Sequence, residues 1–152
     1  MTRTMTQTMT LDQVINQQIA NWNVLYTKLH RFHWYVKGPH FFTLHAKFEE
    51  LYEEAAGTID ELAERLLIVG GMPISTLKEY IQYATIDETS ENLTAEEMVQ
   101  TIVNDYSQII SELKSGKEAA EQVNDEVTSD MFTELIEKLS KHNWMLTSFL
   151  QA

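Results

Sequence analysis

Residues 40–69 read HFFTLHAKFEELYEEAAGTIDELAERLLIV, and this stretch decides the fold. Its apolar residues recur every three or four positions, which is the period of a helix that buries one face. Gly70 and Gly71 follow and mark its end, because glycine is common just after the last helical turn. The buried stripe is expected to consist of Phe41, Leu44, Phe48, Leu51, Ala55, Ile59, Leu62 and Leu66.

The sequence before this stretch predicts a second long helix. Residues 11–36 carry the same helical period, and Gly38–Pro39 separates them from residues 40–69. Gly38 is suited to the end of one helix and Pro39 to the first turn of the next. The two helices are therefore expected to form an antiparallel pair with a short turn.

The sequence after this stretch predicts a second pair of helices. Thr94 and Glu97 form the capping-box pattern that starts a helix, and the polar residues 122–125 lead into a fourth helix. Residues 72–94 form a long connection, in which residues 77–83 have the spacing of a short helix.

Short joins within each pair and a long join between the pairs predict an all-α, ferritin-like four-helix bundle. The short extra helix then lies in the long crossover between helices 2 and 3. A plain four-helix bundle would show the same apolar stripes, so periodicity alone leaves that architecture open.

Length and composition predict one globular domain. Of 152 residues, residues 11–152 are expected to form the bundle, and residues 1–10 (MTRTMTQTMT) a flexible tail. The chain has no cysteine, which excludes disulfides, thiolate metal sites and cysteine nucleophiles. It has no signal-like N-terminus and no long apolar run, so a cytoplasmic protein without a membrane partner is expected.

The formal net charge of −12 indicates which partners suit the surface. An acidic surface attracts metal cations and repels nucleic acid phosphates. The eleven lysines and arginines form no dense cluster, so direct DNA binding is expected to be weak or absent.

Two pairs of potential metal ligands lie on the helix predicted for residues 40–69. His45 and Glu49 form one pair and Asp60 and Glu64 the other, and the i,i+4 spacing puts both members of a pair on one helix face. The fifteen steps from His45 to Asp60 span roughly 22 Å, whereas a metal–ligand bond is only about 2 Å long. The pairs therefore predict two half-sites, which meet when a second copy packs antiparallel across a two-fold axis.

His33 extends the first half-site. It precedes the turn by about the same distance as His45 follows it, so the two imidazoles are expected to lie together. Nitrogen and oxygen ligands of this kind suit Fe, Zn or Mn; iron is the metal we expect, and spacing does not distinguish it from zinc. Alternatively, the acids are solvated and the histidines only pack near the turn. The predicted shared site comprises His33, His45 and Glu49 of one chain with Asp60 and Glu64 of its mate.

The face that carries these ligands also has apolar residues. Tyr52, Ala56, Ala63 and Leu67 widen the apolar surface beyond what one bundle core requires, which favours a subunit interface. Elsewhere, Trp22 and Trp144 are expected in the core.

Residues 33–45, HWYVKGPHFFTLH, resemble the Dps family of miniature ferritins. The similarity continues through residues 47–52, 60–65 and 70–71, covers about residues 11–150, and is greatest to the Dps-like proteins of Bacillus and its relatives. The combined spacing of histidines, acids and the His-Trp dipeptide makes the resemblance specific.

The resemblance implies a hollow shell of twelve subunits with ferroxidase centres at two-fold interfaces. Such proteins oxidise Fe(II) with hydrogen peroxide or oxygen, store ferric mineral and so protect DNA from oxidative damage. The family ligands correspond to His33, His45, Asp60 and Glu64, and Glu49 stands where aspartate is frequent. The resemblance also implies acidic pores for iron entry, in the region of Glu121, Glu126 and Asp130.

The terminal tail differs from that of DNA-coating relatives, because it contains Arg3 but no lysine. DNA is therefore expected to be protected by the removal of Fe(II) and its oxidant, rather than by direct binding of the protein to DNA. The alternatives are a non-enzymatic, nucleoid-associated DNA-binding protein and a structural bundle without metal.

Overall fold

The computed structural model describes residues 9–151 and confirms the predicted fold class. Its described part contains five helices and no strand. The tail predicted for residues 1–10 lies outside the described residues, except for residues 9 and 10. The helices are α1 (Leu11–Tyr35), α2 (Phe41–Ile68), α3 (Leu77–Tyr83), α4 (Ala95–Gln122) and α5 (Glu126–Leu150).

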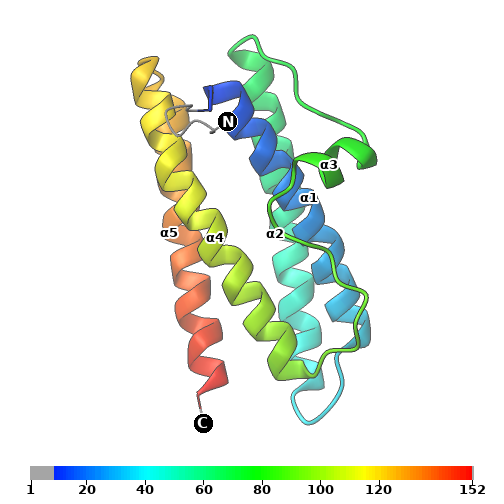
Figure 1. The fold of residues 1–152 in the computed structure, drawn as a ribbon. Helices are drawn as coiled ribbons and strands as arrows, with labels where there is room; N and C mark the ends of the chain where they lie inside the picture. The colour runs from blue at the N-terminus through cyan, green and yellow to red at the C-terminus, as the bar shows by residue number, and fades with distance from the viewer. Residues whose placement is uncertain (1–8, 152) are drawn as a thin grey trace, which may run out of the picture.

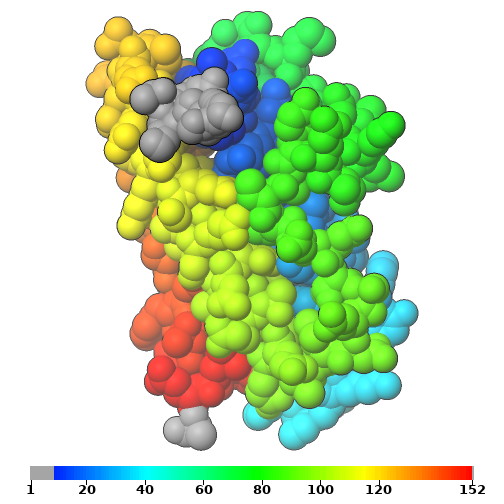
Figure 2. Space-filling view, in the orientation of Figure 1, coloured from blue at the N-terminus to red at the C-terminus, as the bar shows by residue number. Residues whose placement is uncertain are grey.

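The long helices form two antiparallel hairpins, α1–α2 and α4–α5 (Figure 1). The crossover runs back along the bundle from the end of α2 to the start of α4, so α2 and α4 point the same way. This is the ferritin-like connection rather than a simple up-and-down bundle. The crossover and α4 cover much of α1 on the face seen in Figure 2, and α3 packs against α1.

The ends of the helices follow local signals in most places. The capping box of Thr94 and Glu97 is present as predicted, and the short helix occupies residues 77–83 as predicted. The turn between α1 and α2 differs from the prediction. The cap of α1 is Val36, which is extended and buried, and Gly38 (φ +110°) lies in the turn instead of ending α1. Pro39 precedes the cap of α2 and is not part of its first turn.

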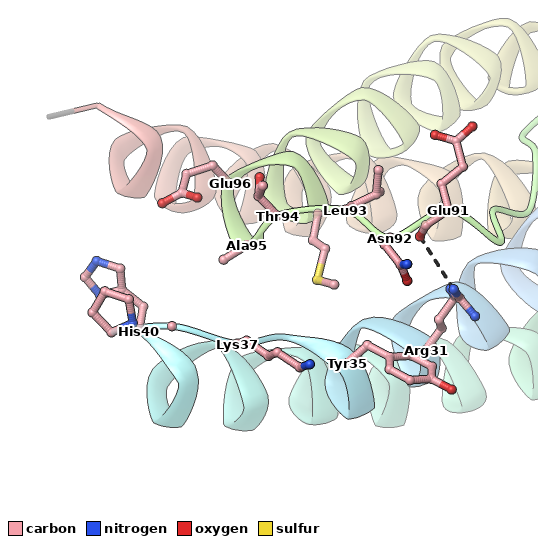
Figure 3. A pocket seen from close by; sticks show the side chains of 13 residues that line it. Arg31, Tyr35, Lys37, His40, Glu91, Asn92, Leu93, Thr94, Ala95 and Glu96 are labelled. Atoms are coloured by element: carbon pink, nitrogen blue, oxygen red, sulfur yellow. Dashed lines mark hydrogen bonds between the residues drawn. The ribbon is translucent and has the colours of Figure 1, made fainter.

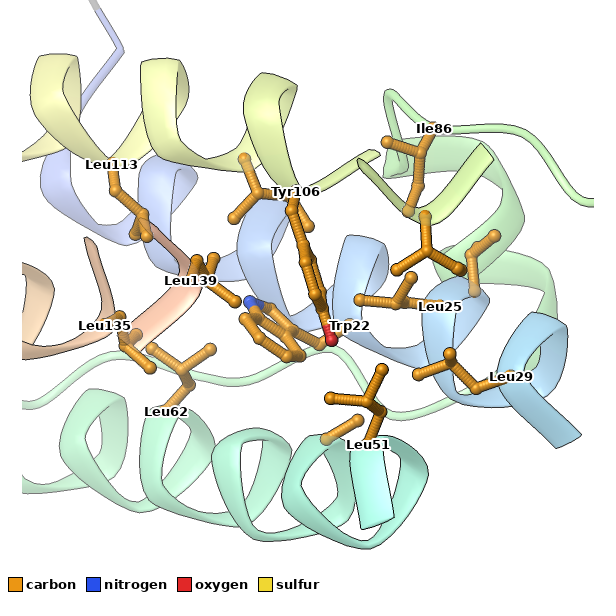
Figure 4. Packing of buried hydrophobic residues seen from close by; sticks show 14 of the residues in the cluster. Trp22, Leu25, Leu29, Leu51, Leu62, Ile86, Tyr106, Leu113, Leu135 and Leu139 are labelled. Carbon is orange, nitrogen blue, oxygen red and sulfur yellow. The ribbon is translucent and has the colours of Figure 1, made fainter. Parts of the chain in front are cut away.

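The core runs along the axis between the hairpins. Trp22 and Tyr106 lie beside one another at its centre, with Leu51 and Leu62 of α2 nearby (Figure 4). The prediction for Trp22 is confirmed. The prediction for Trp144 is wrong, because its side chain is 67% exposed on α5, on a different face of the helix from the buried Leu146.

Polar contacts fix the crossover against the bundle. The buried Asn21 amide donates to Glu112 Oε1 at 2.8 Å and accepts a hydrogen bond from the Thr85 amide at 2.7 Å. Lys28 and Asp105 form a largely buried ion pair between α1 and α4 at 2.6 Å.

No helix in residues 9–151 has the length and apolar character needed to cross a membrane.

Candidate metal centre

Two imidazoles face one another where α1 and α2 meet. His33 belongs to the last turn of α1 and His45 to the second turn of α2. Their rings are stacked, with centroids 3.7 Å apart and planes 16° from parallel. His33 is buried and His45 half-buried. The structure thus brings together the two histidines that the sequence places on either side of the turn.

Each imidazole is held by the backbone of the other histidine. His33 Nδ1 lies 2.7 Å from the His45 carbonyl oxygen, and His45 Nδ1 lies 2.7 Å from the His33 carbonyl oxygen. We call this reciprocal pair of contacts the histidine clasp. The His33 carbonyl lies in the last turn of α1, where carbonyls lack a partner from a following turn, so the clasp also satisfies the end of the helix.

The clasp assigns a role to every ring nitrogen. A carbonyl oxygen can only accept, so each Nδ1 must carry the proton and donate it. In a neutral imidazole the other nitrogen, Nε2, then has its lone pair available. Metal-binding histidines are oriented in the same way, with one ring nitrogen donating to a carbonyl or carboxylate while the other binds the metal.

Other aromatic rings enclose the histidine clasp. Phe41 stacks on His45 at 4.9 Å, and Tyr52 meets the His33 ring edge-on at 5.4 Å. Tyr52 also stacks on His30 at 3.8 Å. Desolvation raises the pKa of Tyr52, and the nearby negative charge of Glu49 raises it further, so Tyr52 remains a neutral phenol.

The carboxylates of the predicted site are less constrained. Glu49 lies one turn after His45 and is half-buried. Asp60 and Glu64 lie toward the other end of α2 and are exposed, and neither makes a side-chain hydrogen bond or ion pair with any residue between 9 and 151. The helical rise keeps them roughly 20 Å from the imidazoles of their own chain. Within the described chain, no group of three or more His, Asp or Glu side chains could hold a metal ion.

A cluster at the far end of α2 was not predicted from the sequence. Arg65 donates to Asp125 Oδ1 at 2.8 Å and to Thr128 Oγ1 at 2.9 Å, which ties the end of α2 to the start of α5. Partial burial works to raise the pKa of Asp125, but hydrogen bonds from Thr128 and Arg65 outweigh it, and the net pKa is lowered. Residues 60 positions apart leave no local pattern, so sequence periodicity could not have found this contact.

The α4–α5 turn next to this cluster is acidic. The exposed carboxylates there belong to Glu121, Glu126 and Asp130, the residues for which the family resemblance implies a pore. Asn124 adopts a positive φ of 58° at the turn itself.

A surface pocket of about 620 Å³ lies between the α1–α2 turn and the start of α4 (Figure 3). Both signs of charge line it, with Arg31, Lys37, Glu91 and Glu96 among its residues. The Arg31 guanidinium already donates to the Ser90 carbonyl at 3.0 Å. The pocket is adjacent to the turn, but His33 and His45 do not line it. The histidine clasp is therefore the better candidate for a metal site, because it presents imidazole nitrogens.

Comparison with known proteins gives consistent results. The model of the family described as ferritin-like domain matches residues 13–152. DNA protection during starvation protein 2 of Bacillus anthracis is 54% identical over 138 residues, which are 91% of this chain and 94% of that protein. General stress protein 20U of Bacillus subtilis strain 168 is 53% identical over 140 residues, covering 92% of this chain and 97% of that protein.

Solved structures agree in fold as well as in sequence. The crystal structure of Dps from Staphylococcus aureus superposes with a TM-score of 0.92 at 48% identity, and covers 93% of this chain and 95% of that one.

Proposed function

The chain belongs to the Dps family of ferritin-like proteins, and from that premise we propose that it is an iron-storage and detoxification protein. It oxidises Fe(II) with hydrogen peroxide or oxygen and keeps the ferric product as mineral inside a shell of twelve copies. Removing Fe(II) and peroxide together protects DNA from oxidative damage. The observation that carries this proposal is the histidine clasp, because it leaves the Nε2 nitrogens of His33 and His45 free to bind a metal.

Iron binds here as the substrate, between two subunits. One chain contributes His33, His45 and Glu49, and the second contributes Asp60 and Glu64. Imidazole and carboxylate ligands suit iron, and zinc, which prefers similar ligands, would compete for the same positions. Two Fe(II) ions each give one electron to one molecule of peroxide, whose O–O bond breaks; with two protons, the products are two Fe(III) ions and two waters. The negative carboxylates stabilise the additional charge on the oxidised metal.

The exposed face of α2 supports pairing of two copies. Phe42 and Leu67 lie at opposite ends of the face that carries the ligands, and their side chains are 85% and 59% exposed. Large apolar side chains of this kind mark an interaction surface. In an antiparallel pair, the carboxylate end of each α2 reaches the imidazole end of the other, so one interface completes two centres.

The negative surface supports a route for iron. The net charge is −12, and Glu121, Glu126 and Asp130 add exposed carboxylates around the α4–α5 turn. A negative field attracts Fe(II). The same field repels DNA phosphates, so protection of DNA is by chemistry rather than by coating.

Complementation between two defective chains tests the shared centre. One variant carries His33→Ala and His45→Ala, and the other carries Asp60→Ala and Glu64→Ala. Each alone is expected to lose fast Fe(II) oxidation by peroxide, measured by stopped-flow absorbance. After dissociation and joint reassembly, a mixed pair has one intact and one doubly defective centre, so random mixing restores about a quarter of the wild-type rate.

Glu61→Ala is the matched control, because Glu61 is an exposed acid next to Asp60 on another face of α2. It is expected to oxidise Fe(II) at the wild-type rate. Wild-type rates in both double variants, or no recovery after mixing, would contradict the shared centre.

A further inference from the structure

The middle of the bundle contains polar atoms that the chain itself leaves without partners. Gln18, Trp22 and Tyr106 are fully buried, and the His142 side chain is only 13% exposed. Among the described residues, no hydrogen-bond partner reaches Gln18 Oε1, Trp22 Nε1, Tyr106 OH or His142 Nδ1. Buried polar atoms in folded proteins are nearly always hydrogen-bonded, so four such atoms in one region require an explanation.

These atoms come from three helices that meet at the same level. Trp22 of α1 lies against Tyr106 of α4, with ring centroids 6.3 Å apart (Figure 4). Tyr106 in turn stacks on His142 of α5 at 5.8 Å. Gln18 precedes Trp22 by four residues, so both side chains lie on the same face of α1. The four residues therefore form a continuous group across the bundle.

The first two atoms are a donor and an acceptor. Trp22 Nε1 can only donate a hydrogen bond, and Gln18 Oε1 can only accept one. The orientation of the Gln18 amide is set by its nitrogen, which donates to Glu112 Oε1 at 2.9 Å. A molecule between Gln18 and Trp22 must accept from the indole and donate to the amide oxygen.

The other two atoms have the same complementarity. His142 Nε2 lies 2.9 Å from Glu54 Oε1, so this nitrogen carries the proton and a neutral ring leaves Nδ1 as an acceptor. Burial raises the pKa of Tyr106 well above its ordinary value, so its hydroxyl keeps its proton and can donate. A molecule between Tyr106 and His142 can accept from the hydroxyl and donate to Nδ1.

We propose that this group, comprising Gln18, Trp22, Tyr106 and His142, is a binding site for ordered water inside the bundle. One water bridges Gln18 Oε1 and Trp22 Nε1, and a second bridges Tyr106 OH and His142 Nδ1. A cation does not suit the indole N–H, and an anion does not suit a region that contains the carboxylates of Glu54 and Glu112. A small neutral molecule that both donates and accepts remains, and buried water commonly makes about three such bonds.

Trp22 anchors its water without passing protons on. Its indole has a donor and no acceptor, so a proton cannot move through it along a chain of waters. The role of the site is therefore to complete the hydrogen bonding of the core. This inference does not depend on iron chemistry, and its test can fail while the proposed function holds.

The test is a high-resolution crystal structure of the assembled wild-type protein and of two variants. In the wild type, ordered water is expected within about 3.2 Å of Trp22 Nε1 and of Tyr106 OH. Tyr106→Phe is expected to lose the water at His142 and keep the one at Gln18, and Trp22→Phe is expected to do the reverse. Direct protein partners for these atoms in the wild type, or a core without water beside them, would overturn the proposal.

Melting temperatures provide a second readout that does not depend on crystals. Tyr106→Phe removes only an oxygen, and its melting temperature is expected to fall by a few degrees because His142 Nδ1 loses its bridged partner. The double variant Tyr106→Phe with His142→Phe is expected to show a smaller decrease in melting temperature than the sum of the two single decreases. The reason is that both changes break the same bridge, which can be lost only once. Strictly additive shifts would contradict a shared water. Tyr26→Phe, whose ring lies outside this group, is the control and is expected to leave the melting temperature unchanged.

Discussion

The two ends of α2, which carry the two halves of the proposed metal centre, differ in how firmly they hold their side chains. At one end, His33 and His45 are stacked and each ring nitrogen has a defined role. At the other end, Asp60 and Glu64 are exposed and unconstrained. An imidazole offers one lone pair in one direction, whereas a carboxylate offers several from two oxygens. In the proposed centre, the imidazoles therefore need to be oriented by folding, whereas the carboxylates could adjust when two subunits pair.

The end of α2 that carries Asp60 and Glu64 is nevertheless anchored by a neighbouring residue. Arg65 follows Glu64 directly and binds Asp125 and Thr128 of the second hairpin. The anchor fixes the position of the helix and leaves the side chains of Asp60 and Glu64 exposed. At the histidine end of α2 the contacts thus orient side chains, whereas at the Arg65 end they hold the backbone in place.

The largest effect is expected from a ligand at the unconstrained end. Asp60→Asn keeps the shape of the side chain and removes its charge, and it is expected to lower the initial rate of Fe(II) oxidation by peroxide by about 100-fold. Stopped-flow absorbance measures this rate, with Glu61→Gln as the control. An unchanged rate in Asp60→Asn would mean that the carboxylate end takes no part in the site.

The next effect concerns stability and should separate the two ends. His45→Ala removes a stacked ring and leaves the His33 carbonyl without its partner, so the free energy of unfolding is expected to fall by about 2–3 kcal/mol. Asp60→Ala is expected to change it by less than about 0.5 kcal/mol. Urea unfolding at equal protein concentrations measures both values. Equal losses would mean that folding constrains the side chains at the two ends of α2 alike.

A smaller loss is expected at the anchor. Arg65→Met keeps the aliphatic stem but breaks the partly buried contact with Asp125, and is expected to lower the free energy of unfolding by about 1–2 kcal/mol. Lys47→Met is the matched control. Lys47 pairs with an exposed Glu50, and exposed ion pairs contribute little. Urea unfolding should show almost no change for the control.

The Asp125 carboxyl makes the anchor dependent on pH. Its pKa is lowered in the folded chain, so the stabilisation is fully present above the ordinary carboxyl pKa and is lost as the pH falls through the lowered value. Asp125→Asn keeps a residue suited to capping α5 but removes the titration. The difference in unfolding free energy between the two proteins should therefore shrink in acid. If the difference in unfolding free energy grew in acid instead, the pKa of Asp125 would be raised in the folded chain and not lowered.

The smallest effect is expected from the ring beside the histidine clasp. Tyr52→Phe keeps the edge-on contact with His33 and the stack on His30, so the melting temperature and the rate of Fe(II) oxidation should remain close to wild type. Tyr52→Ala removes both contacts and should lower the melting temperature. Equal effects of the two changes would mean that the hydroxyl, and not the ring, supports the clasp.

Local patterns predicted much of the fold. The short helix at residues 77–83 and the cap at Thr94 depend on nearby residues, and both are confirmed. The turn at Gly38–Pro39 was predicted differently because the end of α1 depends on burial of Val36, which is a tertiary effect. Trp144 was assigned wrongly because helical spacing identifies apolar residues without deciding which of them a single chain buries.

The candidate site was only partly accessible to sequence reasoning. Symmetry about the turn predicted that His33 and His45 would meet. The contacts of Nδ1 with backbone carbonyls depend on ring orientation, which spacing does not encode. The Arg65–Asp125 contact joins separate hairpins and has no local signature.

The loop beside the histidine clasp is not needed to hold α1 and α2 together. Because the clasp and the buried Val36 join the two helices directly, the exposed residues 37–39 need only cover the distance between them. Extra residues inserted after Lys37 should therefore be accommodated at the surface with the imidazoles still in register. The loop is therefore a suitable place to insert a reporter peptide.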